Sequence, residues 1–237
     1  MTAVESEATA IPAVQARPVR QRLIEAGERL FAEHGCNGVG IRTIAAAADV
    51  SLAALNYHFG EKENLLAEIF AARARPIAAE RMRLLAEIEA SGEPTLERVI
   101  EAFLRPALAS ASDSRFGGKV FAKLRARLAT EPEAFSRRIL ADAFDESGRC
   151  YIAAFRELLP DLPAEDLYWR FHFLLGSMVY TMADPGRIQS MTDGRCDPGD
   201  VEAALLHIVP FLAAGFRAAP AKPVRRPRRK TQQAQGR

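Results

Sequence analysis

Apolar residues recur at three- and four-residue spacing along most of this chain, and this spacing constrains its fold more than any other feature. In the last such segment, for example, Val201, Leu205 and Ile208 fall on one face of a helix. No segment shows the alternation of Val, Ile and Thr that is typical of a strand. We therefore predict an all-α fold of about nine helices.

Two short predicted helices near the N-terminus, over about 41–48 and 52–58, are joined by a turn of about three residues. Ser51 precedes the second helix and is a favoured N-cap residue. A longer helix over about 18–34, ended by Gly35, precedes the pair. The inner faces would pack against it through Ile44, Ala45, Val50, Leu55 and Phe59. This is the helix-turn-helix arrangement, whose second helix enters the major groove of DNA. Short alanine-rich helices also occur in ordinary α-bundles, so the pair alone leaves both interpretations open.

Four runs of residues surround this pair in a fixed order: 22–27 (RLIEAG), 30–35 (LFAEHG), 41–51 (IRTIAAAADVS) and 56–66 (NYHFGEKENLL). Together they resemble the DNA-binding domain of the TetR family over about 50 residues. The resemblance implies an all-α homodimer with one helix-turn-helix in each subunit and a C-terminal ligand-binding domain. We accordingly predict a DNA-binding domain over 17–66 and a ligand-binding and dimerisation bundle over 67–217.

The resemblance also implies the DNA-contacting residues. Those facing the groove would be Thr43, Ser51, Leu52, Ala53 and Ala54, and those facing phosphates would be Asn56, Tyr57, His58 and Lys62. Arg42 is a further candidate for a DNA contact. One position departs from the family pattern, because Val39-Gly40 stands where a capping Ser or Thr is usual. We expect that phosphate contact to be missing, although glycine still caps a helix tolerably. Residues 17–66 hold six basic and six acidic groups, so local rather than net charge must attract the DNA.

The predicted helix over about 164–183 is apolar nearly all round, so it must be buried on more than one side. With the last helix, over about 201–216, it would form a four-helix interface in a homodimer. The alternative is a monomer in which this helix is central. In a dimer the two recognition helices would lie about 34–36 Å apart and require a palindromic operator on double-stranded DNA.

Aromatic and polar residues of the second half are candidates for an effector pocket, although most would serve equally well as core. They are Phe103, Phe121, Leu124, Phe144, Tyr151, Phe155, Arg170, His172 and Phe173. The segments 158–163, 169–178 and 51–59 look similar to the PsrA-like branch of the family. That similarity implies a small apolar effector, a long-chain fatty acid or acyl conjugate, whose carboxylate Arg170 or His172 would meet. The alternative for these two residues is an ordinary surface charge at Arg170 and a hydrogen-bonded core histidine at His172. An unrelated drug-like ligand is the alternative. Repression relieved by the effector is the function that the resemblance implies.

Motifs of common enzyme classes, including GxSxG, HExxH and GxGxxG, are absent, and the four histidines lack metal-ligand spacing. We predict no enzymatic activity, no metal and no cofactor; a helical binding module without a DNA function is the remaining alternative. The three cysteines are far apart, which fits a reducing cytoplasm. The longest apolar run, over 173–183, is too short to span a bilayer, so no membrane association is expected.

Four further predictions concern the ends of the chain and of its helices. Residues 1–16 are expected to be disordered and not a signal peptide. Residues 218–237 carry seven basic groups and no acidic one, and are expected to form a disordered tail, either purely solvated or attracting DNA nonspecifically.

Pro76 should kink or end a helix that begins near Glu61, and is a candidate hinge. The run Thr130 to Glu133 reads as a capping box that opens a helix over about 132–159.

Overall fold

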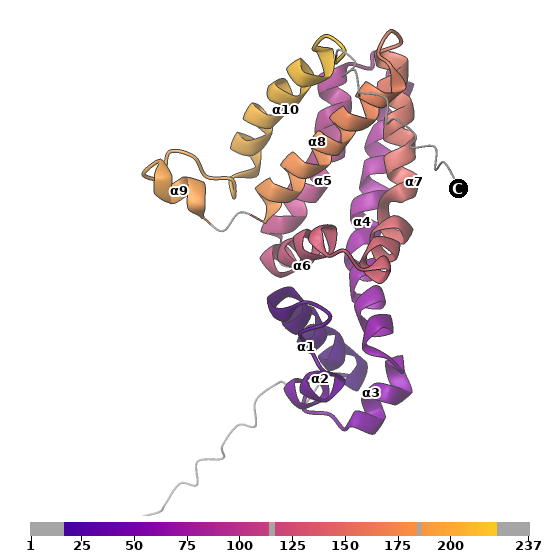
Figure 1. Cartoon of the computed structure of the whole chain (residues 1–237), viewed down its shortest axis with the longest axis vertical. Helices are drawn as coiled ribbons and strands as arrows, with labels where there is room; N and C mark the ends of the chain where they lie inside the picture. Colours follow the sequence, from indigo (N-terminus) through magenta and orange to yellow (C-terminus); the bar gives the residue numbers. More distant parts are fainter. Residues whose placement is uncertain (1–16, 114–116, 184–185, 222–237) are drawn as a thin grey trace, which may run out of the picture.

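The structure, a computed structural model, describes residues 17–113, 117–183 and 186–221, and contains only helices and their connections within these ranges (Figure 1). This confirms the all-α prediction. There are ten helices in the described residues, against about nine expected, and the additional one is α9. The helices are α1 (Val19–His34), α2 (Ile41–Ala47), α3 (Leu52–Phe59), α4 (Lys62–Ala90), α5 (Leu96–Ser112), α6 (Gly118–Thr130), α7 (Ala134–Leu158), α8 (Ala164–Met182), α9 (Arg187–Met191) and α10 (Val201–Arg217).

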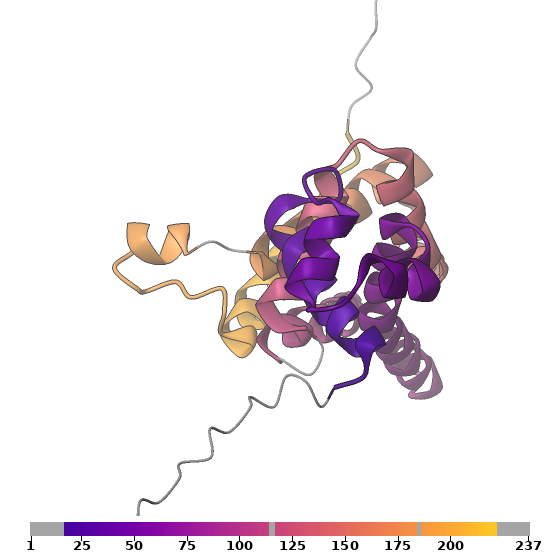
Figure 2. The same ribbon diagram turned by 90° about the horizontal axis from the view of Figure 1, so that it is seen from below.

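Helices α1 to α3 form a small three-helix unit at one end of the molecule, which Figure 2 shows from below. Of the side chains that the sequence placed on the inner faces, Ile44, Ala45, Leu55 and Phe59 are buried and Val50 is half-buried. Leu23 and Phe31 of α1 are buried in the same core. Gly35 ends α1 with a φ of 74°, a left-handed conformation that glycine adopts without steric cost. The hydrophobic spacing therefore sets the packing of this unit as predicted.

Helix α4 runs from this unit deep into the bundle formed by the later helices (Figure 1). Pro76 lies inside the helix, so the expectation that the helix could end there is wrong. Proline removes one backbone hydrogen bond and crowds the carbonyl one turn earlier. Ala74 and Ile77, on either side of it, are buried in the core. Tertiary packing of this face thus holds α4 helical through Pro76.

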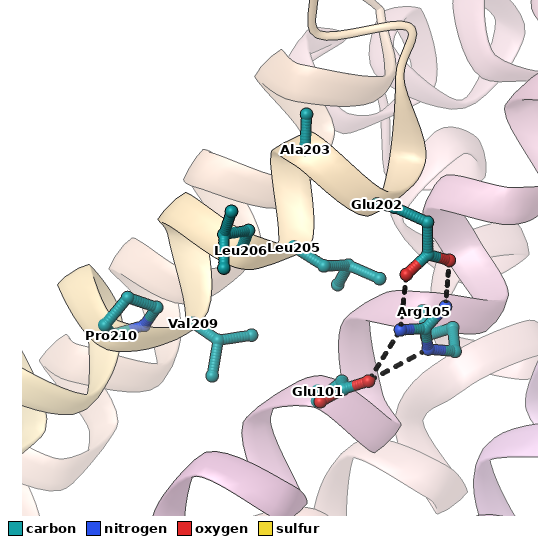
Figure 3. Close-up of a pocket in the computed structure, with 8 residues that line it drawn as sticks. All are labelled: Glu101, Arg105, Glu202, Ala203, Leu205, Leu206, Val209 and Pro210. Carbon is teal, nitrogen blue, oxygen red and sulfur yellow. Dashed lines mark hydrogen bonds and ion pairs between the residues drawn. The ribbon is translucent and has the colours of Figure 1, made fainter.

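The C-terminal bundle has α5 at its centre, in contact with α4, α6, α7, α8 and α10. Two ion-pair clusters attach α10 to α5 at its two ends. At the first, Arg105 of α5 bonds both Glu101 of its own helix and Glu202 of α10 (Figure 3). At the second, the Arg217 guanidinium donates to both Glu97 carboxylate oxygens, at 2.6 and 2.8 Å. These clusters fix which face of α10 points away from the bundle.

The three-helix unit and the bundle meet where α1 packs on α6 and α4. Glu28 of α1 is buried and receives two hydrogen bonds from the Arg73 guanidinium, Nε to Oε1 at 2.9 Å and Nη2 to Oε2 at 2.8 Å. This pairing raises the pKa of Arg73. Gly117 has a φ of +90°, and a Cβ there would lie 2.7 Å from Glu28 Oε1. Arg127 of α6 also donates to the Glu33 carbonyl at 3.0 Å. The junction is therefore a polar contact between the two units.

Some predicted helix boundaries are wrong or lie outside the described residues. Thr130 ends α6 and donates to carbonyls of its own last turn, so the capping box expected from Thr130 to Glu133 does not form. Helix α7 instead begins at Ala134, without a side-chain cap on Glu133. The tail beyond 221, the segment 1–16 and the expected start of a helix at Phe116 lie outside the described residues. In both views α9 stands out from the bundle (Figures 1 and 2).

Candidate nucleic-acid interface

Helix α3 presents one polar face to solvent and one apolar face to α1. The Ser51 hydroxyl accepts a hydrogen bond from the Ala54 amide at 3.1 Å, which confirms it as the N-cap. Leu55 and Phe59 are buried and hold the inner face. The predicted site residues of this segment are divided between exposed and half-buried positions. Ser51, Ala53, Asn56, Tyr57 and His58 are exposed, and Leu52 and Ala54 are half-buried.

Helix α2 contributes the exposed side chains of Arg42 and Thr43 at its first turn. Its N-cap is Gly40, and no side chain caps it, as the departure at Val39-Gly40 predicted. Its first turn has no acidic residue, so the free amides and Arg42 can face an anion without nearby carboxylate repulsion on this helix. The surface thus offers donors from both helices of the pair.

The turn between α2 and α3 is held by a contact that sequence reasoning missed. Asp49 has a φ of 52°, a left-handed conformation uncommon for a residue other than glycine. Arg22 of α1 donates from Nη1 to the Asp49 carbonyl at 3.0 Å, and the same nitrogen lies 3.5 Å from Asp49 Oδ2. The side chain of Arg22 is only 14% exposed. A cation within the first helix therefore fixes the angle between the two helices that would meet DNA.

Replacing Arg22 with methionine should destabilise the protein by about 2 kcal/mol, because the charge-assisted hydrogen bond to the Asp49 carbonyl is lost. The loss would appear as a lower midpoint in urea unfolding. Arg29→Met is the matched control, since Arg29 is exposed on the same helix, and it should leave the midpoint unchanged. Equal midpoints for the two variants would show that Arg22 does not hold the turn.

Lys62, predicted to face a phosphate, is half-buried at the start of α4. Its ammonium group donates to the Cys36 carbonyl at 2.7 Å and to the Val39 carbonyl at 3.2 Å. Both carbonyls belong to the loop before α2. The structure therefore places Lys62 beneath the exposed surface, where it fixes the loop that carries Gly40.

The candidate effector residues are not brought together as one group. Phe103, Phe121, Leu124, Tyr151 and Phe155 lie in the core, and Phe144 is half-buried beside them. Arg170 donates to the Phe216 and Ala219 carbonyls at the end of α10. His172 and Phe173 are exposed on the outer face of α8. His172 and Phe173 are thus separated from the aromatic members in the core, and Arg170 is bonded to the end of α10.

Two further expectations, on metal binding and on membrane-spanning helices, can be compared with the described residues. They contain no group of three or more His, Cys, Asp or Glu side chains that could hold a metal ion. Within the same ranges, every helix is too short or too polar to cross a bilayer.

Two protein families match separate parts of this chain. Residues 23–69 match the family described as "Bacterial regulatory proteins, tetR family". Residues 101–215 match the family described as "Tetracyclin repressor-like, C-terminal domain". The first match contains the whole helix-turn-helix, and the second contains α6 to α9 and most of α5 and α10.

Curated relatives are similar over less than a third of this chain. The repressor AcnR of Corynebacterium glutamicum is 41% identical over 68 residues, which are 29% of this chain and 34% of AcnR. The repressor DhaR of Mycobacterium sp. strain GP1 is 38% identical over 66 residues, 26% of this chain and 33% of DhaR. The chain thus matches about a third of the length of these relatives.

Solved structures share the fold over most of the chain. FadR from Bacillus subtilis, in complex with stearoyl-CoA, is 15% identical with a TM-score of 0.56, covering 82% of this chain and 98% of that one. FadR from Bacillus halodurans is 18% identical with a TM-score of 0.55, covering 86% and 98%. With both domain matches in order and this fold, the chain belongs to the TetR family of bacterial transcription regulators.

Proposed function

We propose that this protein is a dimeric repressor that binds a palindromic operator through α2 and α3 and is released by a small apolar effector. The observation that carries the DNA-binding part is the outer face of α3. Tyr57 is 86% exposed there, between Asn56 and His58, on a helix held by the Ser51 cap and the buried Leu55. A polar face on a rigid, capped helix suits recognition in the major groove.

Tyr57→Ala should weaken binding to the operator about tenfold or more, because a hydrogen bond to a charged phosphate is lost. A gel-shift titration against the DNA upstream of the gene measures this. Tyr57→Phe removes only the hydroxyl and should lose most of the same affinity. Unchanged binding by Tyr57→Ala would show that α3 does not contact the DNA as proposed.

The outer faces of α8 and α10 support the dimer. These helices pack side by side (Figure 1) and expose Trp169, Phe173, Leu206 and Phe211, each more than half exposed in one chain. The Trp169 and Phe173 rings stack with their centroids 5.9 Å apart. No charged residue lies between Glu202 and Arg217 on α10. An apolar aromatic face of this kind is typical of an interface between subunits.

An acyl effector is supported by the sequence similarity of segments 158–163 and 169–178 to the PsrA-like branch. It also agrees with a structural neighbour, B. subtilis FadR, which was solved with stearoyl-CoA. The aromatic core formed by Phe103, Phe121, Tyr151 and Phe155 would surround an acyl chain after modest repacking. Release of DNA would then follow from the effector's preference for one arrangement of the two units.

The contact between the two units would transmit effector binding from the bundle to the three-helix unit. Helix α6 contacts α1 directly, through Arg127 and through Gly117 beside Glu28. An effector that displaces α6 would therefore move the three-helix unit relative to the bundle. In a dimer this changes the spacing of the recognition helices, to which binding at two successive major grooves is sensitive.

A further inference from the structure

Two arginines lie in the interior of the bundle. Arg81 of α4 is 1% exposed and Arg125 of α6 is 4% exposed. Long charged side chains are almost never fully buried unless they are paired with an opposite charge. Neither of these has a carboxylate within ion-pair distance among the described residues. Their burial therefore needs an explanation that the other side chains do not supply.

The partners of Arg81 are neutral. Its Nε donates to the Phe103 carbonyl at 2.8 Å, and its Nη2 lies 3.1 Å from the Met178 sulfur. Its guanidinium carbon also lies 3.7 Å from the centroid of the Phe103 ring. The hydroxyl of Tyr151 donates to the backbone carbonyl of Arg81 at 2.8 Å, which fixes this turn of α4.

Arg125 is held less firmly. Its Nη1 lies 3.8 Å from the Met182 sulfur, and its guanidinium carbon lies 4.3 Å from the centroid of the Phe144 ring. The guanidinium carbon of Arg81 lies 5.6 Å from the centroid of the same ring. The two cations therefore lie near the same aromatic ring, and each contacts a methionine sulfur from α8. Thioether sulfur is a weak acceptor and leaves most of the charge uncompensated.

The two positive charges destabilise each other. Burial lowers the pKa of Arg125 to about 10, and burial together with the nearby Arg125 charge lowers the pKa of Arg81 well below its usual range. An anion bound close to both would pair with them and would replace part of the lost hydration. Guanidinium groups suit this role because they bind carboxylate and phosphate oxygens in a bidentate manner.

We propose that Arg81 and Arg125 form a buried site for the anionic group of the effector, so that the effector is an apolar organic anion and not a neutral or cationic compound. This inference rests on the proposed effector-binding role of the C-terminal domain. It reassigns the polar end of the ligand from Arg170 and His172, which the sequence favoured, to two side chains at the centre of the aromatic core.

A groove gives the anion a route to this site. It has a volume of about 1060 Å³, and Met182, the methionine that contacts Arg125, forms part of its wall. Lys119 and Lys123 are exposed on α6 along its rim. Methionine side chains change rotamer readily, so displacement of Met182 would open Arg125 to the groove. The lysines would raise the local concentration of an anion at the entrance.

A second groove that is lined by a cation is unsuitable as an anion site. It lies between α5 and α10, has a volume of about 640 Å³, and its cation is Arg105 (Figure 3). Arg105 already bonds the carboxylates of Glu101 and Glu202. The positive charge of Arg105 is already neutralised by two carboxylates, so that groove would repel a further anion. The pair of Arg81 and Arg125 would attract one.

The test compares ligands that differ only in charge. Thermal melting of the full chain is measured with palmitate, 1-hexadecanol, palmitoyl-CoA and CoA alone. At about 100-fold excess over its Kd, a bound anion should raise Tm by about 5 °C or more. We expect palmitate or palmitoyl-CoA to do so, and 1-hexadecanol and CoA to have little effect. The comparison of palmitate with palmitoyl-CoA identifies the source of the anion. Equal shifts with palmitate and 1-hexadecanol, or no shift with either acyl anion, would overturn the proposal.

The Arg125→Met variant provides the second part of the test. It should lose the anion-induced shift, and it should raise the Tm of the ligand-free protein by roughly 3 °C or more, because an unpaired buried charge is removed. A merely structural arginine would give the opposite change. Arg149→Met, at an exposed arginine of α7, is the matched control and should change neither quantity. A retained anion response, or a lower ligand-free Tm, in Arg125→Met would contradict the proposal. If Arg125→Met does not fold, the ligand comparison on the unaltered chain decides alone.

Failure of this inference can be distinguished from failure of the proposed function. Operator binding by the ligand-free protein is measured in parallel by gel shift. A chain that responds to the acyl anion but retards no upstream DNA retains the anion site and loses the repressor assignment. A chain that retards DNA but responds to no anion retains the DNA-binding role and loses this site.

Discussion

Replacing Phe211 with glutamate should convert the protein to a monomer and weaken operator binding about 100-fold or more. Phe211 is 70% exposed on the apolar face of α10, which is fixed against α5 by Glu202 and Arg217 at its two ends. In a twofold-symmetric dimer one substitution places two carboxylates in the same interface. Loss of the second DNA contact then removes the gain in affinity that linked binding sites provide, on the order of 100- to 10,000-fold.

Sedimentation equilibrium at micromolar concentration measures the mass, and gel shift measures the affinity. Met191→Glu is the control, because Met191 is 68% exposed on α9, away from the stacked rings of α8. It should remain dimeric with unchanged affinity. A Phe211→Glu variant that still sediments as a dimer would rule out the α8 and α10 face as the interface.

Replacing Glu28 with glutamine should destabilise the protein by about 3 kcal/mol, because its buried carboxylate loses the two charge-assisted hydrogen bonds from Arg73 at the junction of the two units. The Glu28 side chain is 7% exposed and that of Arg73 24%, so solvent compensates for only part of the loss. Urea unfolding measures the change. Glu28→Met combined with Arg73→Met should recover most of the stability, since apolar side chains replace both members of the buried ion pair.

The control for this prediction is Glu87→Gln, which breaks an exposed ion pair with Arg83 within α4. Exposed pairs are solvated and contribute little, so its unfolding midpoint should stay close to that of the unaltered chain. If Glu28→Gln were as stable as Glu87→Gln, the junction would not depend on this buried pair.

Much of the fold follows from local pattern. The spacing of Leu23, Phe31, Leu55 and Phe59 predicts the three-helix unit, and the Ser51 cap predicts where α3 begins, because both signals act within one or two turns. Pro76 shows the limit of such reasoning. Its local cost is real, but the buried face of α4 on both sides of it keeps the helix continuous.

Side-chain placement in the candidate site was harder to predict, because it depends on contacts between distant segments. Arg81 lies in the run from Glu80 to Arg83, which has the composition of a solvated helix face, and only packing of five helices buries it. Lys62 binds carbonyls 23 and 26 residues earlier in the chain. Arg170 is held by the end of α10, 46 residues later. No local sequence signal specifies these partners.

The most direct test of the repressor assignment is a DNase footprint on the upstream DNA, combined with the mass of the complex in solution. A dimeric repressor predicts a protected palindrome with half-sites one helical turn or a multiple of it apart, and an even number of subunits on each duplex. A footprint without twofold symmetry, or a complex with a single subunit, would contradict it.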